Sequence, residues 1–495
     1  MTSADLTSLV RPQTLRGFRD ILSAEMIVRN DVIGKIRHVY ESYGYVPMDT
    51  PVLELLPTLV GTGGEDTDKL IFTLQSPEKQ QVGLRFDLTV PFARVIAQYH
   101  PAEIKLPFRR YHIGPVFRAD DPQPEQGRFR QFTQFDIDIA GTATVAADAE
   151  IIAAMSDAFR AIGLLYDCPP GDPRRYVIRV NNRRLVDAFL LGIDIDDPVV
   201  AKHILRVIDK RDKLTDNELI AELGAGRTDA SGDQIRGVGL AAETIRSIFE
   251  FISIAGSKRA EVLASLDKAI RPGREKDEAL SEVQLLCEHL DALGVPEEAA
   301  QLDPSLTRGL DYYTNTVFEG ALPQAGVGSV MGGGRYNDLV NRFLDEPIPA
   351  TGASIGLDRL VTGLRNIGLF AGEQQSTVEV LVLVMPGVPE PESSRVAAEL
   401  RAHGIGAELY VGEATGKVKR QLAFANARGM SVAVLLGAGE LAQGAVSIKD
   451  LRTGSEAREG IADREEYRSA GTVGQKTVPR TELVDTVRQV LALGN

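Results

Sequence analysis

Alternation between two kinds of side chain over Gln131–Ile139 is the feature that most narrows the possible fold. A period of two predicts a β-strand whose two faces differ. The expected core face comprises Thr133, Phe135, Ile137 and Ile139, and the opposite face comprises Phe132, Gln134, Asp136 and Asp138. The surrounding segment Lys105–Gly141 has a middle rich in Pro, Asp and Gln, so it predicts a long hairpin of two antiparallel strands.

The polar face of this strand has two interpretations. An isolated strand commonly turns such a face toward solvent. Here, however, Arg118 closes the first strand and Arg128 opens the second, so a hairpin brings both guanidinium groups near the carboxylates. Arginines beside acids and an aromatic ring suit a ligand that carries phosphates, a flat ring and an ammonium group. We therefore expect a ligand site on this face.

Two strand-rich blocks are separated by a helical one. The segment Ile193–Pro296 is charged, acidic and helical in character, with no strand signals, so we expect an inserted subdomain. Strand-like sequence resumes at Ser305 and leads to a helix that begins near Leu357. Near the start of the chain, apolar residues at three- and four-residue spacing predict a helix from Val28 that ends at Gly44.

A different pattern follows a polar linker, Ala371–Thr377. Over Val378–Leu436 strand and helix signals alternate as βαβαβ, with helices predicted around Glu392–His403 and Lys417–Arg428. This order predicts a small, separate α/β domain with a largely parallel sheet. We assign residues 378–495 to it.

Composition limits the class of protein. A chain of 495 residues is too long for one core. Its net charge of −14 counts against nucleic-acid binding, but residues 378–495 carry 14 Lys and Arg against 15 Asp and Glu and can present a basic face. The sequence has no apolar run of membrane-spanning length, and because its start, Met1 to Val10, is polar, we expect no signal peptide. With only two cysteines, Cys168 and Cys287, it predicts no disulfide framework, and we expect a cytoplasmic protein.

Three segments resemble the motifs of class II aminoacyl-tRNA synthetases. The helix from Val28 and a strand predicted over Tyr45–Thr50 are similar to motif 1. Phe117–Asp120 together with Gly127–Phe132 closely resembles motif 2. Thr351–Leu360 resembles motif 3, in which the start of a helix presents an arginine. Three motifs in this order indicate the class.

Further motifs point to histidine. Thr307–Tyr313 and Gly332–Tyr336 resemble the two histidine-specific motifs of the histidyl-tRNA synthetase family. Leu84–Thr89 resembles another family signature, in the form with Asp where other members have Glu. Gly437–Glu440 with Lys449–Leu451 is similar to the anticodon-binding domain of the same group. The resemblance spans nearly the whole chain.

The resemblance implies how histidine is held. The residues implied are Asp87, Thr89 and Gln134 for the α-ammonium group, Asp138 and Tyr313 for the imidazole ring, and Tyr336 in the same pocket. A site that satisfies both polar ring atoms rejects amino acids that lack them. The alternative for the tyrosines is core packing with a satisfied hydroxyl, above all for Tyr312.

The resemblance also implies how ATP is held and attacked. The ATP-binding residues implied are Arg118, Asp120, Arg128, Phe132 and Arg359. Phe132 and Arg359 would enclose adenine, and Arg128, if not a surface charge, would reach the outer phosphates. Arg118 and Arg308 would be catalytic, stabilising charge at the α-phosphate. Positions 308 and 313 differ by an odd number, so a bulge or loop must intervene. Glycines 332–334 are expected to let backbone approach the ligand.

The implied fold is an α+β catalytic domain with an antiparallel sheet, interrupted by a helical insertion and followed by an α/β anticodon-binding domain. The ranges expected for it are 1–192 and 297–370 for the catalytic domain, 193–296 for the insertion and 378–495 for the last domain. ATP with Mg²⁺, histidine, tRNA(His) and a second copy of the chain are the implied partners, with no membrane and no metal held by protein side chains.

Two alternatives remain at this stage. One is the inactive, synthetase-like regulatory subunit of ATP phosphoribosyltransferase, which normally lacks the last domain and has degraded histidine motifs. The other is a class II synthetase for another amino acid.

Overall fold

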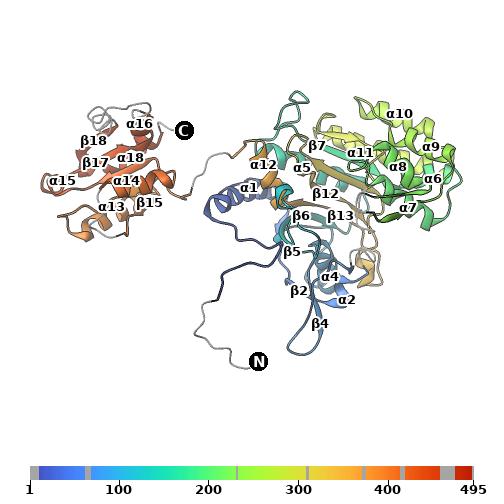
Figure 1. The fold of residues 1–495 in the computed structure, drawn as a ribbon, viewed down its shortest axis with the longest axis horizontal. Coiled ribbons are helices and arrows are strands. Elements are labelled where there is room, and N and C mark those ends of the chain that lie inside the picture. Colours follow the sequence, from blue (N-terminus) through green and yellow to red (C-terminus); the bar gives the residue numbers. More distant parts are fainter. Residues whose placement is uncertain are drawn as a thin grey trace. The chain divides into compact units, whose positions relative to one another are not determined.

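The computed structural model describes residues 10–61, 68–229, 232–307, 312–370, 375–412, 418–456 and 474–492. The chain forms two compact units. The first includes Val32–Leu369, and the second includes the described residues from Phe370 onward. Figure 1 traces the chain through both units.

A mixed sheet of eight strands forms the centre of the first unit (Figure 1). In order across the sheet, the strands are β1 (Val46–Pro47), β5 (Phe108–Phe117), β6 (Gln131–Ala140), β13 (Ala350–Gly356), β12 (Ser329–Tyr336), β11 (Thr316–Ala321), β7 (Val177–Asn182) and β10 (Ala300–Leu302). Only the edge pairs β1–β5 and β7–β10 are parallel. The predicted hairpin is confirmed, because β5 and β6 pair antiparallel along their whole length.

The apolar face of β6 packs against a helix. Outside the region expected to be an insertion, the helices of the part of the chain that carries this sheet include α1 (Ser23–Ser42), α2 (Leu56–Leu59), α4 (Thr89–Tyr99), α5 (Val145–Ala161), α6 (Arg183–Gly192) and α12 (Leu357–Asn366). The helix that packs against β6 is α1. The ring of Phe135 lies 4.9 Å from that of Tyr40 in α1, and both side chains are fully buried, as is Ile137. The predicted core face of the strand is therefore confirmed. So is the end of the first helix, since Gly44 follows it with φ 79°.

The strand predicted over Tyr45–Thr50 is shorter than expected, since only β1 pairs with the sheet. This segment lies at the sheet edge, and Pro47 has no N–H group to extend the ladder. A second sheet of three strands comprises β2 (Leu53–Leu55), β4 (Gln81–Leu84) and β3 (Thr73–Gln75).

The region expected to be a helical insertion does contain a series of helices. They are α7 (Pro198–Ile208), α8 (Asp216–Leu223), α9 (Ala242–Ile252), α10 (Arg259–Ala269) and α11 (Arg274–Ala292). The prediction that it lacks strands was wrong, because β8 (Gly226–Thr228) and β9 (Gln234–Arg236) pair as a short hairpin. These two strands are three residues long and mostly polar, so they give no periodic signal. Helix α11 packs against α5 and α6.

Strand structure after this region begins earlier than expected. Strand β10 ends at Leu302, before Ser305, and β11 starts only at Thr316. The described residues between these strands, 303–307 and 312–315, form no strand. The helix expected near Leu357 is confirmed as α12.

The second unit is an α/β domain with its own sheet. The strands, in sheet order, are β15 (Ala407–Leu409), β14 (Val380–Val382), β16 (Val432–Leu435), β17 (Ala445–Asp450) and β18 (Gln475–Pro479). The helices are α13 (Glu390–Ala402), α14 (Val418–Ala427), α15 (Ala438–Ala442), α16 (Leu451–Glu456) and α18 (Leu483–Ala492). The first three strands pair in parallel, and β17 pairs antiparallel with both β16 and β18. The βαβαβ order is therefore confirmed, but the parallel pairing is limited to three strands.

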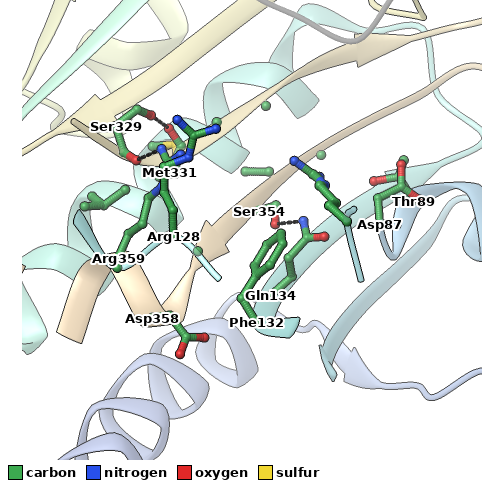
Figure 2. A pocket seen from close by; sticks show the side chains of 18 of the residues that line it. Asp87, Thr89, Arg128, Phe132, Gln134, Ser329, Met331, Ser354, Asp358 and Arg359 are labelled. Carbon is green, nitrogen blue, oxygen red and sulfur yellow. Dashed lines mark hydrogen bonds between the residues drawn. The ribbon is translucent and has the colours of Figure 1, made fainter. Parts of the chain in front are cut away.

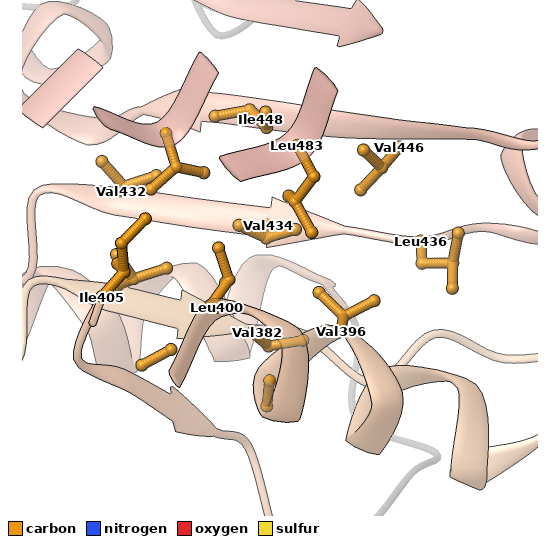
Figure 3. Packing of buried hydrophobic residues seen from close by; sticks show 14 of the residues in the cluster. Val382, Val396, Leu400, Ile405, Val432, Val434, Leu436, Val446, Ile448 and Leu483 are labelled. Carbon is orange, nitrogen blue, oxygen red and sulfur yellow. The ribbon is translucent and has the colours of Figure 1, made fainter. Parts of the chain in front are cut away.

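The core of this domain lies between its sheet and two of its helices. Val382 and Val434 from the sheet pack with Leu400 of α13 and Leu483 of α18 in one buried apolar cluster (Figure 3). Across the part of the chain that the structure describes, no helix is long and apolar enough to cross a membrane.

Candidate active site

A cavity of about 380 Å³ lies over the polar face of β6. It is lined by every candidate site residue that the structure describes, namely Asp87, Thr89, Arg118, Asp120, Arg128, Phe132, Gln134, Asp138, Tyr313, Tyr336 and Arg359. In the view of Figure 2, Arg128 and Arg359 lie on one side and Asp87 and Thr89 on the other, with Phe132 and Gln134 between them. Arg308 lies outside the described residues.

The polar face of β6 is buried, which excludes the solvated interpretation. Gln134, Asp136 and Asp138 are 6%, 1% and 2% exposed. Gln134 and Asp138 line the cavity, whereas Asp136 pairs across the sheet with Ser354 and His112. Burial raises the pKa of Asp136 to about 8, although the nearby Arg110 guanidinium opposes the shift.

One end of the cavity has two acceptor oxygens in need of a donor. Asp87 Oδ1 accepts a hydrogen bond from the Val90 amide at 3.0 Å, and Gln134 Nε2 donates to Ser354 Oγ. The second oxygens, Asp87 Oδ2 and Gln134 Oε1, are buried and have no hydrogen-bond partner within the described residues. Burial raises the pKa of Asp87 to about 6, while Arg118 and Arg110 hold it down. An ammonium group would satisfy both oxygens.

A second carboxylate at this end is held by a tyrosine and an arginine. Tyr336 donates its hydroxyl proton to Asp138 Oδ1. Asp138 Oδ2 lies 2.8 Å from Arg110 Nη2 but outside hydrogen-bond geometry, so it keeps the capacity to accept from a ligand. Burial raises the pKa of Asp138, and the Arg110 guanidinium opposes that shift. Only glycine fits at Gly352, because a Cβ atom there would lie 2.0 Å from Asp138 Oδ1.

Three tyrosine rings meet beside this carboxylate. The Tyr312 ring lies 4.8 Å from that of Tyr313 and 5.9 Å from that of Tyr336, edge to face in both cases. Tyr312 and Tyr313 are consecutive, yet both line the cavity, which a regular strand does not allow. Tyr312 packs in the neighbouring apolar cluster and also lines the cavity, so this tyrosine combines core packing with a place in the cavity wall.

The opposite end of the cavity carries two cations, Arg128 and Arg359 (Figure 2), whereas Arg118 lies nearer the middle, beside Phe132 and close enough to Asp87 to lower its pKa. Arg118 Nε donates to the Phe86 carbonyl at 3.0 Å, and its guanidinium lies 5.2 Å from the Phe132 ring centre. Arg359 Nη1 donates to the Ser329 carbonyl at 2.9 Å. Arg128 Nη2 donates to Asp120 Oδ2 at 2.6 Å, and these two side chains are 29% and 46% exposed. Asp120 thus lines the cavity and accepts a hydrogen bond from Arg128.

The glycines of the second histidine motif serve strand packing as much as ligand approach. A Cβ atom on Gly333 would lie 2.3 Å from the Gly352 carbonyl oxygen, and one on Gly334 would lie 2.5 Å from that of Thr316. Because these two glycines have no Cβ atom, the backbones of the neighbouring strands can approach β12 this closely. Arg335 lies on the face of β12 opposite to that of Tyr336. It forms an ion pair with Asp148 at 2.9 Å and donates hydrogen bonds to the carbonyl oxygens of Thr142 and Thr144.

Sequence reasoning missed several residues that shape the site. Arg110 stands opposite Asp138 in the β5–β6 register, and Ser354 holds Gln134. Asp358 accepts from the Thr133 amide and from Arg19, both at 2.8 Å, and so fixes the start of α12. No sequence pattern marked these residues, although a glycine within a strand, such as Gly352, indicates a close approach by a neighbouring group.

Family comparison agrees with this geometry. The family model described as histidyl-tRNA synthetase matches residues 17–360, more than half of the chain. The chain belongs to the histidyl-tRNA synthetase family. The model described as an anticodon binding domain matches residues 379–489, the second unit of the fold.

Similar proteins carry the same family name along nearly their full length. A histidine–tRNA ligase of Rhizobium rhizogenes is 40% identical, with 97% of each chain covered, and one of Caulobacter vibrioides is 38% identical, with 96% of each covered. The crystal structure of histidyl-tRNA synthetase from Nostoc sp. PCC 7120 matches with a TM-score of 0.77 and 28% identity, covering 97% of this chain and all of that one. A structure from Bacillus halodurans C, titled ATP phosphoribosyltransferase regulatory subunit/histidyl-tRNA synthetase, matches at 24% identity with a TM-score of 0.66 and shows a shared fold alone.

Proposed function

We propose that this chain is a histidine–tRNA ligase. It activates L-histidine with ATP to histidyl-adenylate and then transfers the histidyl group to the 3′ end of tRNA(His). The observation that carries the proposal is the single cavity in which two buried, unsatisfied acceptors and the Asp138–Tyr336 pair face a set of arginines. The names of relatives about 40% identical over nearly the whole chain support it.

Histidine fits the buried end of the cavity. Its α-ammonium group would donate to Asp87 Oδ2 and Gln134 Oε1, with Thr89 beside them. Its imidazole N–H would donate to Asp138, and Tyr313 would pair with the other ring nitrogen. Most other amino acids would leave Asp138 and Tyr313 unpaired, which costs far more binding energy than a missing methylene does.

ATP fits the end that carries the cations. Arg118 would bind the α-phosphate, Arg128 the outer phosphates, and Phe132 and Arg359 would enclose adenine. A histidine carboxylate oxygen attacks the α-phosphorus and pyrophosphate leaves. The tRNA terminal hydroxyl then attacks the carbonyl carbon of the adenylate and AMP leaves. By resemblance, Arg308 joins Arg118 in stabilising the charge that develops in the first step.

Mg²⁺ enters as the complex with ATP. Within the described residues, no group of three or more His, Cys, Asp or Glu side chains is arranged to hold a metal ion. A magnesium ion that keeps several waters and is bound mainly by substrate phosphates suits such a site.

The remaining partners follow from the family. The second unit, in our assignment residues 378–495, would bind the anticodon of tRNA(His), and residues 193–296 would form the insertion. We also propose that two copies associate through the motif 1 region, where Val46, Leu53 and Leu55 are about half-exposed apolar side chains. We place the reaction in the cytoplasm, since both cysteines are free thiols.

The regulatory-subunit alternative lacks comparable support. It predicts a degraded histidine end, whereas Asp87, Gln134, Asp138 and Tyr336 are all in place around the cavity. It also predicts a chain without the last domain, which is present here.

Charging of tRNA(His) with labelled histidine tests the proposal. The full chain should form histidyl-tRNA in the presence of ATP. A chain ending at Ser376 should still form the adenylate but charge tRNA more weakly, because the anticodon contacts are lost. A full chain that forms neither adenylate nor histidyl-tRNA contradicts the proposal. A truncated chain that does not fold contradicts our domain boundary alone.

A further inference from the structure

The histidine end of the cavity is joined to helix α11 by a chain of hydrogen bonds. Glu282, in the middle of α11, accepts from Asn315 Nδ2 through both carboxylate oxygens, at 3.0 and 3.1 Å. Asn315 Oδ1 in turn accepts from Asn337 Nδ2 at 3.2 Å. Asn315 comes two residues after Tyr313, and Asn337 directly follows Tyr336. One carboxylate from the region outside the sheet thus connects the backbones that carry both tyrosines.

The segment that Glu282 holds has little regular structure of its own. Residues 312–315 form no strand, and their backbone is fixed by a few contacts. The Thr314 amide donates to the Arg335 carbonyl at 2.8 Å, and Arg183 Nη1 donates to the Tyr313 carbonyl at 3.3 Å. A segment without a strand ladder depends on side-chain anchors for its position. Asn315 is the anchor nearest to Tyr313 whose side chain bonds to α11.

Glu282 is suited to this role by burial and by its other partners. Its side chain is 13% exposed, so its hydrogen bonds are only weakly screened by water. Asn182 Nδ2 donates to Oε1 at 2.8 Å and Arg184 Nη1 to Oε2 at 3.1 Å. Donors from two other elements therefore fix the direction in which the carboxylate points. A hydrogen bond to a charged group contributes more than one between neutral groups.

We propose that Glu282 is a positioning residue for the two tyrosines of the histidine end, so that α11 takes part in selecting the amino acid. The inference rests on the proposed function and deepens it. Loss of the Glu282 carboxylate frees Asn315 and Asn337, and the tyrosine rings then lose their fixed distance from Asp138. Because ATP binds at the other end of the cavity, histidine binding should suffer while ATP binding does not.

The chain offers a matched control one helical turn away. Glu278 lies on the same helix and pairs with the same arginine, Arg184, at 2.6 Å, and also with Arg274 at 2.7 Å. Among the residues that the structure describes, the hydrogen bonds of Glu278 go to Arg184 and Arg274 and not to Asn315 or Asn337. Glu278→Gln and Glu282→Gln therefore make the same chemical change on one helix, but only the second touches the chain that leads to the tyrosines.

The test is ATP–pyrophosphate exchange by the full chain, with separate KM values for histidine and ATP, and a melting curve for each variant. Glu282→Ala and Asn315→Ala should each raise the histidine KM about tenfold, equivalent to about 1.4 kcal/mol. The ATP KM should stay within twofold. Glu282→Gln should give a smaller rise, because the amide retains one acceptor oxygen, and Glu278→Gln should match the wild type.

A folded Glu282→Ala variant with an unchanged histidine KM overturns the inference, and so does an equal rise in both KM values. If Glu282→Ala fails to fold, Glu282→Gln and Asn315→Ala decide by the same criteria. The wild type is measured first. An inactive wild type contradicts the proposed function, whereas an active wild type with unaffected variants contradicts the role of Glu282 alone.

Discussion

The two ends of the cavity differ in how they are built. At the histidine end, Asp87 and Asp138 are 1% and 2% exposed, and their positions are fixed by a backbone amide, a tyrosine and a buried arginine. At the ATP end, Arg128 and Asp120 face each other as a partly exposed pair. Charges interact strongly in the first environment and are screened by water and salt in the second.

This difference indicates which substrate the fold is built to discriminate. Every amino acid can satisfy Asp87 and Gln134 through its ammonium group, but few carry a side chain that also satisfies the buried Asp138 and Tyr313. An exposed end with an arginine already paired can adjust as phosphates replace the carboxylate partner. Equivalent substitutions at the two ends should therefore have unequal effects.

The largest effect is expected from Asp138→Asn. The amide removes the negative charge that faces Arg110 and offers the imidazole a weaker acceptor, at a position where the side chain is buried. We expect kcat/KM for histidine in the exchange reaction to fall by about 10²–10³-fold, as when a buried charged partner is lost. The ATP KM serves as the internal control. Activity within tenfold of the wild type would mean that Asp138 does not bind the ring.

A smaller effect is expected from the protonation of Asp87. Its pKa is raised to about 6 by burial, so the carboxylate takes up a proton as the pH falls below that value and can no longer balance the α-ammonium charge. We expect kcat/KM for histidine to rise with pH through about 6 and then level off, with about a tenfold loss one unit below the pKa. A pH profile from 5 to 8 measures this.

The control for this profile is Asp87→Asn. Free histidine also titrates near pH 6 through its imidazole, and that contribution remains in the variant. The difference between the pH profiles of the wild type and the variant therefore gives the contribution of Asp87 protonation. Identical profiles would show that another group controls the rise.

The smallest effect is expected from Asp120→Asn at the exposed end. An exposed ion pair contributes about 0–1 kcal/mol, so the ATP KM should change by less than about fivefold. Salt should weaken even this difference, whereas the defect of Asp138→Asn should persist at high salt. Steady-state exchange at two salt concentrations makes the comparison. A loss as large as that of Asp138→Asn would remove the distinction between the two ends.

Sequence patterns predicted the parts of this site that depend on local order. Alternation over β6 placed Gln134 and Asp138 on the ligand face, and the hairpin brought Arg118 and Arg128 to the same cavity. The edge strand β1 and the pair β8–β9 were misjudged, because short strands carry too few residues to show a period. Periodicity is informative only over several residues.

Contacts between distant segments could not be predicted in this way. Arg110 meets Asp138 because the β5–β6 register places them opposite each other. Glu282 and Asn315 are 33 positions apart along the chain. They meet because α11 packs against α5 and α6, beside the eight-stranded sheet. Neither residue stands in a motif, and a single sequence does not show which distant residues meet.

The most direct test of the account is ATP–pyrophosphate exchange by the full chain with each of the twenty amino acids in turn. The account predicts exchange with histidine only, because every amino acid can donate its ammonium group to Asp87 and Gln134, but only the histidine ring satisfies both Asp138 and Tyr313. Comparable exchange with another amino acid, or none with histidine, would contradict it.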